Sequence, residues 1–191
     1  MSSRRSELTR EAARLFAERG YHGTSIGDLA QALGVQKASL YAHISSKQDL
    51  LYAAMREGAD AFHAALDAVP EEAPAGEKIR LAMRSHLRVV GDQLDVATVF
   101  VREWRYLEGD RRAEILDERR RYEERFRAFF REGRELGELR TDLDDGAAAL
   151  LTLSAMNWAY TWLAPGRDTD ELADRFHAIL LDGIRGYATR E

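Results

Sequence analysis

The chain has 191 residues, with 28 lysines and arginines, 33 aspartates and glutamates, and no cysteine. The lack of cysteine excludes disulfide bonds, thiolate metal sites and cysteine nucleophiles, and is compatible with the cytoplasm, where we expect the protein to act. The first residues lack the apolar run of a signal peptide. A net charge of −5 argues against binding to nucleic acid, but residues 1–50 carry +2 and the remainder −7. We therefore expect the N-terminal 50 residues to be mildly basic and the rest of the protein to be acidic.

Residues 24–50 contain two short helical patterns joined by a tight turn. The first pattern begins at Thr24 or Ser25, where a hydroxyl can cap the helix, and Asp28 follows three positions after Ser25, as in a capping box. Its apolar residues fall at helical spacing and end near the turn: Ile26, Leu29, Ala30 and Leu33. Gly34 supplies the backbone freedom for a sharp turn. A second helix is expected over residues 36–43, with Leu40 directed into the core.

Two short helices joined in this way are typical of a helix-turn-helix, whose second helix enters the major groove of DNA. Hydrogen-bonding side chains are expected on its outward side: Gln36, Lys37, Ser39, Tyr41 and His43. Glutamine can bond adenine and lysine can bond guanine from the start of such a helix. Each residue alone has an ordinary explanation as packing or as solvated surface. Their order and spacing together favour DNA binding.

About the first 50 residues resemble the TetR/AcrR-type bacterial transcriptional regulators. The matching residues are Leu8, Ala12, Leu15, Phe16, Gly20, Tyr21, Thr24, Ser25, Asp28, Leu29, Ala30, Gly34, Val35, Leu40, Tyr41, His43, Ser46, Lys47, Leu50 and Leu51. Three positions depart from the family. Gln36 stands where a serine usually caps the recognition helix, Ala38-Ser39 replaces a Gly-Thr type pair, and Ile44 replaces a phenylalanine.

The resemblance implies roles for individual residues in this chain. Gln36, Lys37 and Ser39 would face base edges. The phosphates would be held by Tyr41, His43, Lys47 and the hydroxyl of Thr24 or Ser25. The resemblance also implies a homodimer on a double-stranded palindromic operator, and a regulator rather than an enzyme, with no catalytic residues, cofactor or metal. We therefore expect a DNA-binding domain over residues 1–50 and a ligand-binding and dimerisation domain over 51–191.

The chain after residue 50 has helical periodicity throughout, so the predicted fold class is all-α, with a three-helix head and a helical body. Ser45 or Ser46 is expected to cap a long helix that continues to Pro70. Glycine and proline positions then separate further predicted helices at 77–91, 93–108, 111–134, 144–164 and 169–188.

Residues 146–166 contain no charged side chain and are nominally long enough to span a bilayer. Their many alanines and interspersed polar residues favour a buried interfacial helix instead, with no membrane contact. Together with the apolar stripe of the last helix, this segment supplies more apolar surface than a thin monomer can cover. A four-helix dimer interface is therefore expected. Its predicted residues are Leu150, Leu153, Phe176, Ile179, Leu180 and Ile184.

Residues 102–140 combine 12 arginines with interleaved aromatic residues. Such helices mostly form a solvated face, but a pocket among them would suit a ligand with an apolar tail and an anionic head. The run GELRTDLD at 137–144 and the pair Asn157-Trp158 are similar to TetR-type regulators that sense acyl-coenzyme A esters. We therefore expect a small-molecule inducer, with an acyl-coenzyme A ester as one candidate. The predicted ligand residues are Phe62, Met83, Leu87, Arg102, Trp104, Arg105, Tyr122, Arg125, Phe126, Asn157 and Trp158.

Two other functions stay open at this point. The pairs Asp60-x-x-His63 and Asp174-x-x-His177 supply half of a carboxylate-bridged dimetal site in a helical bundle, although no inward-facing glutamate pair completes it. Metal content of the purified protein distinguishes that enzyme. The second alternative is an architectural DNA-binding protein without a ligand, which the absence of any ligand-induced thermal stabilisation would indicate.

Overall fold

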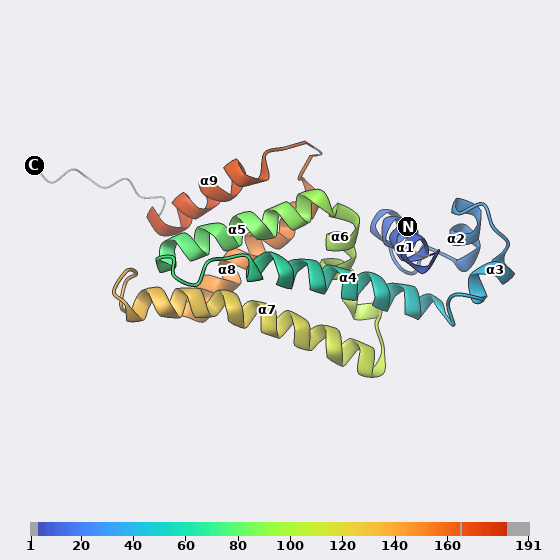
Figure 1. Ribbon diagram of the computed structural model, residues 1–191, viewed down its shortest axis with the longest axis horizontal. Helices are drawn as coiled ribbons and strands as arrows, with labels where there is room; N and C mark the ends of the chain where they lie inside the picture. The colour runs from blue at the N-terminus through green and yellow to red at the C-terminus, as the bar shows by residue number, and fades with distance from the viewer. Residues whose placement is uncertain (1–3, 165, 183–191) are drawn as a thin grey trace, which may run out of the picture. The chain divides into compact units, whose positions relative to one another are not determined.

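The computed structural model describes residues 4–164 and 166–182, and this part of the chain consists of helices without strands (Figure 1). The helices are α1 (Arg4–Arg19), α2 (Ile26–Ala32), α3 (Lys37–Tyr41), α4 (Lys47–Asp67), α5 (Ala75–Asp92), α6 (Leu94–Arg102), the 3₁₀ turn η1 (Trp104–Tyr106), α7 (Gly109–Glu135), α8 (Asp145–Asn157), the 3₁₀ turn η2 (Trp158–Thr161) and α9 (Thr169–Asp182). The predicted all-α fold is confirmed. No helix among these is long and apolar enough to cross a membrane.

The chain divides into two compact units. The first combines Met1–His63 with Asp92–Arg121, and the second combines Ala64–Gly91 with Tyr122–Glu191. Helices α4 and α7 each contribute residues to both units because the divisions fall within them. The expected boundary near residue 50 separates a DNA-binding function from a ligand-binding function, and it stays a prediction.

In the first unit, α6 packs closely against α1 and α4. Gly58 on α4 makes the second contact possible, because a Cβ atom there would lie 3.0 Å from the Cβ of Phe100 on α6. The Phe62 and Phe100 rings pack with centroids 5.5 Å apart. The α1 side of the core is formed by fully buried side chains of the predicted apolar stripe: Leu8, Ala12, Leu15 and Phe16. Residues from the middle of the chain therefore share a core with the N-terminal helices.

In the second unit, ion pairs join α5 to α9 along one edge. Asp174 accepts hydrogen bonds from Arg84 and Arg80, and Asp170 accepts them from Arg88. Because residue numbers rise on one helix as they fall on the other, the two helices are antiparallel. The guanidinium groups of Arg84 and Arg80 lower the pKa of Asp174 to about 2. At neutral pH this edge is fully charged and paired.

The helices α7 and α8 of the second unit are joined through Asp145. This buried carboxylate accepts hydrogen bonds from Arg127 (2.7 Å) and Arg134 (2.9 Å) of α7. Those bonds, with Arg127 the larger contributor, hold the pKa of Asp145 below its usual range. The start of α8 is thereby fixed to α7.

Three predicted helices differ from those observed. The 144–164 helix ends at Asn157 and tightens into η2, a stretch rich in residues of modest helix propensity. The 93–108 helix is divided into α6 and η1. The 169–188 helix is observed over Thr169–Asp182, and its remaining positions lie outside the described residues.

The core of the second unit contains a buried histidine. His86 on α5 is 1% exposed, and its Nδ1 atom lies 3.0 Å from the hydroxyl oxygen of Tyr122 on α7. Burial lowers the pKa of His86 to about 3, because an imidazolium ion would lose its hydration there. The imidazole is therefore neutral in the folded protein at physiological pH.

We expect the free energy of unfolding to fall as pH is lowered from about 6.5, the pKa of an unfolded histidine, towards 3. In that window the unfolded chain binds a proton that folded His86 excludes. The free energy of unfolding therefore falls by about 2 kcal/mol between pH 6.5 and 5. Asp174 adds no loss there, because its depressed pKa matters only below pH about 4. Urea unfolding at pH 5, 6 and 7 measures the effect, and His86→Gln should flatten the profile. Identical profiles for the two proteins would contradict this assignment.

Candidate DNA-binding surface and ligand cavity

Helix α2 is fixed at its start by a reciprocal capping box. Ser25 Oγ accepts the backbone N–H of Asp28 at 3.1 Å, and the Asp28 carboxylate accepts the backbone N–H of Ser25 at 2.7 Å. Hydrogen bonds from the Ser25 side chain and backbone hold the pKa of Asp28 below its usual value. The capping box predicted from the spacing of these two residues is confirmed.

The turn between α2 and α3 depends on Gly34. Its φ of +63° lies in the left-handed region, which glycine adopts without the steric penalty of other residues. The next amide, of Val35, donates to the carbonyl of Ala30 at 2.9 Å and closes the end of α2. The chain then enters α3 at Lys37, as the helix-turn-helix pattern predicts.

Helix α3 turns one apolar side chain inward and its polar side outward. Leu40 is fully buried, and Tyr41 is 56% exposed. The predicted DNA-facing residues of this helix and its ends are all exposed: Gln36, Lys37, Ser39, Tyr41 and His43. Gln36 occupies the N-cap without a side-chain capping bond, so its amide can bond a partner. These five exposed residues, called the α3 row below, supply donors and acceptors suited to base edges and phosphates.

Two predicted phosphate contacts, Thr24 and Lys47, form bonds within the protein. Thr24 is 1% exposed, and its hydroxyl donates to the carbonyls of Leu15 and Gly20, both at 3.1 Å. The prediction of Thr24 as a phosphate ligand is therefore corrected, and of the two hydroxyls only Ser25 lies at the surface. The chain's path from α1 into α2 buries Thr24, which sequence spacing could not show.

Lys47 is also occupied within the protein. Its Nζ donates to the carbonyls of Tyr21 and Thr24, both at 2.9 Å, and lies 4.0 Å from the centre of the Tyr21 ring. Partial burial lowers its pKa. Lys47 therefore joins the start of α4 to the link between α1 and α2.

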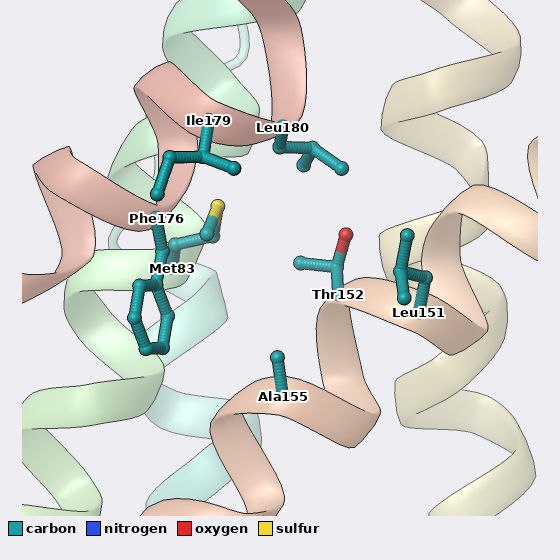
Figure 2. A pocket seen from close by; sticks show the side chains of 7 residues that line it. All are labelled: Met83, Leu151, Thr152, Ala155, Phe176, Ile179 and Leu180. Atoms are coloured by element: carbon teal, nitrogen blue, oxygen red, sulfur yellow. The ribbon is translucent and has the colours of Figure 1, made fainter. Parts of the chain in front are cut away.

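The second unit contains an apolar cavity of about 380 Å³ among α5, α8 and α9. Figure 2 shows the side chains of the three helices around one space; they belong to Met83, Leu151, Thr152, Ala155, Phe176, Ile179 and Leu180. The one hydroxyl in this lining, that of Thr152, donates to the carbonyl of Ala148 at 2.8 Å. The volume lies in the range of small-molecule sites, roughly 300–1,000 Å³, and the lining suits a hydrocarbon group.

A second hollow in the same unit, of about 450 Å³, has a mixed polar lining that includes Lys78 and Arg125. Lys78 is paired with Glu132 at 2.7 Å, and Arg125 is paired with Asp67 at 2.8 Å. Its cations are therefore already neutralised by acids of the chain, which makes it a poorer site for an anion.

The predicted ligand residues are divided between the two units. Phe62, Arg102, Trp104 and Arg105 belong to the first, and Met83, Leu87, Tyr122, Arg125, Phe126, Asn157 and Trp158 belong to the second. Of this set, Met83 lines the apolar cavity and Arg125 the polar hollow. Arg102 donates to two main-chain carbonyls of α1, and Trp158 is exposed. The aromatic pattern could not distinguish residues that pack in the core from residues that line a pocket.

The residues of the proposed metal alternative bind other groups. Asp60 pairs with Arg56 at 2.9 Å and Asp174 is held by two arginines, while His177 Nε2 lies 2.9 Å from the carbonyl of Gly76. Within the described ranges, 4–164 and 166–182, no three histidine or carboxylate residues are grouped as a metal site.

The predicted interface residues differ in their exposure to solvent. Leu150 and Ile179 are exposed, while Phe176 and Leu180 are half-buried and line the cavity. The prediction of Leu153 as an interface residue is corrected, because this side chain is 6% exposed and packs within the chain itself. The rotation of α8 exposes Leu151 instead, which the sequence analysis missed. Ile184 lies outside the described residues.

Comparison with known families identifies the architecture. A model described as bacterial regulatory proteins, tetR family, matches residues 8–54, and a model of the Tetracyclin repressor-like C-terminal domain matches residues 72–184, more than half of the chain. The chain belongs to the TetR family. The exposed row on α3 is therefore the candidate operator-reading surface of a TetR-family helix-turn-helix regulator.

Similar TetR-family proteins cover nearly the whole chain. The crystal structure of PfmR from Thermus thermophilus is 34% identical, covers 97% of this chain and 100% of its own, and has a TM-score of 0.89. AibR in complex with isovaleryl coenzyme A and operator DNA is 33% identical, with coverage of 94% and 98% and a TM-score of 0.85. The transcriptional repressor KstR2 of Rhodococcus jostii is 27% identical over 187 residues, or 96% of this chain and 92% of KstR2.

Proposed function

We propose that this TetR-family protein is a homodimeric repressor that binds a palindromic operator through residues 1–50. Residues 51–191 would form the dimer and bind a small-molecule inducer. The observation that carries the proposal is the set of exposed polar residues in the α3 row. The helix that carries them follows α2, which starts with a capping box, and a sharp turn at Gly34. The repressor KstR2 and operator-bound AibR support repression and operator binding as the activity to test.

The proposal gives separate roles to the residues of the row. Gln36, Lys37 and Ser39 lie at the start of α3 and would read base edges, because the N-terminal part of a recognition helix reaches deepest into the groove. Tyr41, His43 and Ser25 would bind phosphates. Phosphate contacts set affinity and register, whereas base contacts set sequence preference.

Gln36→Ala and Lys37→Ala should each relax preference at one base position of the operator by about 1–3 kcal/mol. The Lys37 variant removes a cation as well, so the slope of binding affinity against salt should fall by about one. Fluorescence anisotropy with single-base operator variants measures both effects, and Gln93→Ala, at the start of α6, is the matched control. Unchanged base preference in both head variants would contradict the base-reading assignment.

The dimer proposal rests on exposed apolar side chains of the second unit. Leu150, Leu151 and Ile179 are large and mostly exposed on α8 and α9, although monomeric proteins seldom expose such groups together. Packing these helices against those of a second copy would cover them. A dimer also presents two recognition helices, as a palindrome requires.

Ile179→Asp should dissociate the dimer at micromolar concentration, because it places an unpaired carboxylate in the proposed interface. Operator binding should weaken with it, since one head contacts only a half-site. Leu136→Asp is the matched control, because Leu136 is equally apolar and exposed but lies beyond α7 in a loop. Multi-angle light scattering checks the masses, and a dimeric Ile179→Asp variant would refute this interface.

The apolar cavity is the site that we propose for the acyl part of the inducer. Its lining lacks a charged side chain, so it would hold a short hydrocarbon chain, while a coenzyme A group would lie outside it. AibR, a relative of 33% identity, was crystallised with isovaleryl coenzyme A. The inducer would favour a dimer form whose heads do not fit successive major grooves, and so shift the population away from DNA.

Isovaleryl coenzyme A should raise the melting temperature of the protein and release operator DNA. At one hundred times its dissociation constant a ligand adds about 2.7 kcal/mol to the free energy of unfolding. Ala155→Trp should abolish the thermal shift by filling the cavity, whereas Ala147→Trp, at an exposed position of the same helix, should keep it. Equal shifts in both variants would place the ligand elsewhere, and no shift with any acyl ester would contradict this ligand class.

A further inference from the structure

We infer that Arg102 and Glu103, at the C-terminal end of α6, are positioning residues for DNA binding. We call this pair the Arg102–Glu103 clamp. It holds the C-terminal end of α1 and the first residues of the link to α2, and it thereby sets how α2 and α3 are presented. The inference rests on the proposed function, because it explains how the operator-reading helices are held in place.

Glu103 is the buried half of the clamp. Its side chain is almost completely enclosed, with 3% of the residue exposed. One carboxylate oxygen accepts the backbone N–H of Tyr21 at 2.9 Å, across 82 positions of sequence, and the other accepts a hydrogen bond from Arg102. A buried carboxylate is costly unless it is paired and hydrogen-bonded, so this geometry is tightly specified.

Arg102 is the half that contacts the helix end. Its guanidinium donates to the carbonyls of Phe16 and Ala17, both at 3.0 Å, in the last turn of α1. Carbonyls there lack a full set of helix partners, and the helix dipole favours a cation at this end. The clamp therefore binds α1 at its carbonyls and the following link at an amide.

The contact continues into η1. The Tyr106 ring stacks on the Tyr21 ring with centroids 5.8 Å apart and lies 4.5 Å from the His22 ring. The backbone carbonyl of Tyr106 also accepts a hydrogen bond from the Gln48 side chain at 2.6 Å. Residues 102–106 thus contact α1, the link after it and the start of α4.

The clamp belongs to a segment that the C-terminal family model covers. Residues 92–121 lie within the match to the C-terminal domain, residues 72–184, yet they fold into the same compact unit as the head. Their two ends continue directly into the second unit, at Gly91 and Tyr122.

The test compares two duplexes, an operator selected by the wild-type protein from a random library and an unrelated sequence of equal length. Glu103→Ala should lower operator affinity on the order of tenfold and leave affinity for the unrelated duplex unchanged, because the residues proposed to contact phosphate remain. The salt slope should stay the same. Glu103→Gln should have a smaller effect, since its amide oxygen can still accept the Tyr21 N–H.

A double-mutant cycle shows whether the two residues act together. Arg102→Ala alone leaves the buried carboxylate of Glu103 poorly paired, so the double variant should bind the operator measurably better than the product of the two single effects predicts. Glu108→Gln removes a carboxylate from an exposed position of the same segment and should behave as wild type.

Three results would overturn the inference: wild-type operator affinity in Glu103→Ala, an equal loss for both duplexes, or independent effects in the cycle. Circular dichroism confirms folding, and if the alanine variant does not fold, Glu103→Gln and the cycle with it decide. Amide exchange of Tyr21, which needs no DNA, should be faster in each clamp variant than in Glu108→Gln. Failure of the wild type to select any duplex contradicts the proposed function, while unchanged Tyr21 exchange contradicts the clamp.

Discussion

The placement of α2 and α3 depends on how the link between α1 and α2, residues 20–24, is held. Helices of 7 and 5 residues, such as α2 and α3, are too short to be stable alone, so their position is set by what surrounds them. The link is bonded by the Thr24 hydroxyl from within, by Lys47 from α4 and by Glu103 from α6. Each of these bonds comes from a buried or half-buried polar group, whose loss leaves its partner unsatisfied.

The second unit combines a charged edge with an apolar interior. The arginines of α5 pair with the acids of α9, and Asp145 binds the arginines of α7, so the outer contacts of these helices are ionic. The cavity between α5, α8 and α9 has no such contacts. A hydrocarbon ligand could therefore enter without breaking an ion pair, and its binding energy would be available to shift the population between two arrangements.

Local features of the head could be predicted because they depend on residues close in sequence. The Ser25–Asp28 capping box, the Gly34 turn and the inward Leu40 all follow from spacing and backbone preference. The roles of Thr24 and Lys47 could not be predicted, because they depend on where α1 and α4 meet the link. Their assignment as phosphate contacts came from the resemblance to the TetR family alone.

Features of the body were harder to predict for the same reason. Arg102 and Glu103 bond residues more than 80 positions away, and no periodicity records such a contact. On α8, apolar residues occur on every side of the helix, so the pattern could not show that Leu153 faces inward and Leu151 outward. The uncharged run also concealed the end of α8 at Asn157.

Selection of duplexes from a random-sequence library by the wild-type protein, with sequencing of the bound fraction, tests the central claim most directly. The account predicts an enriched palindrome whose half-sites are centred about 10–10.5 base pairs apart, or a multiple of that, and are bound by a dimer. Binding that shows no enriched sequence and varies with salt alone would contradict it.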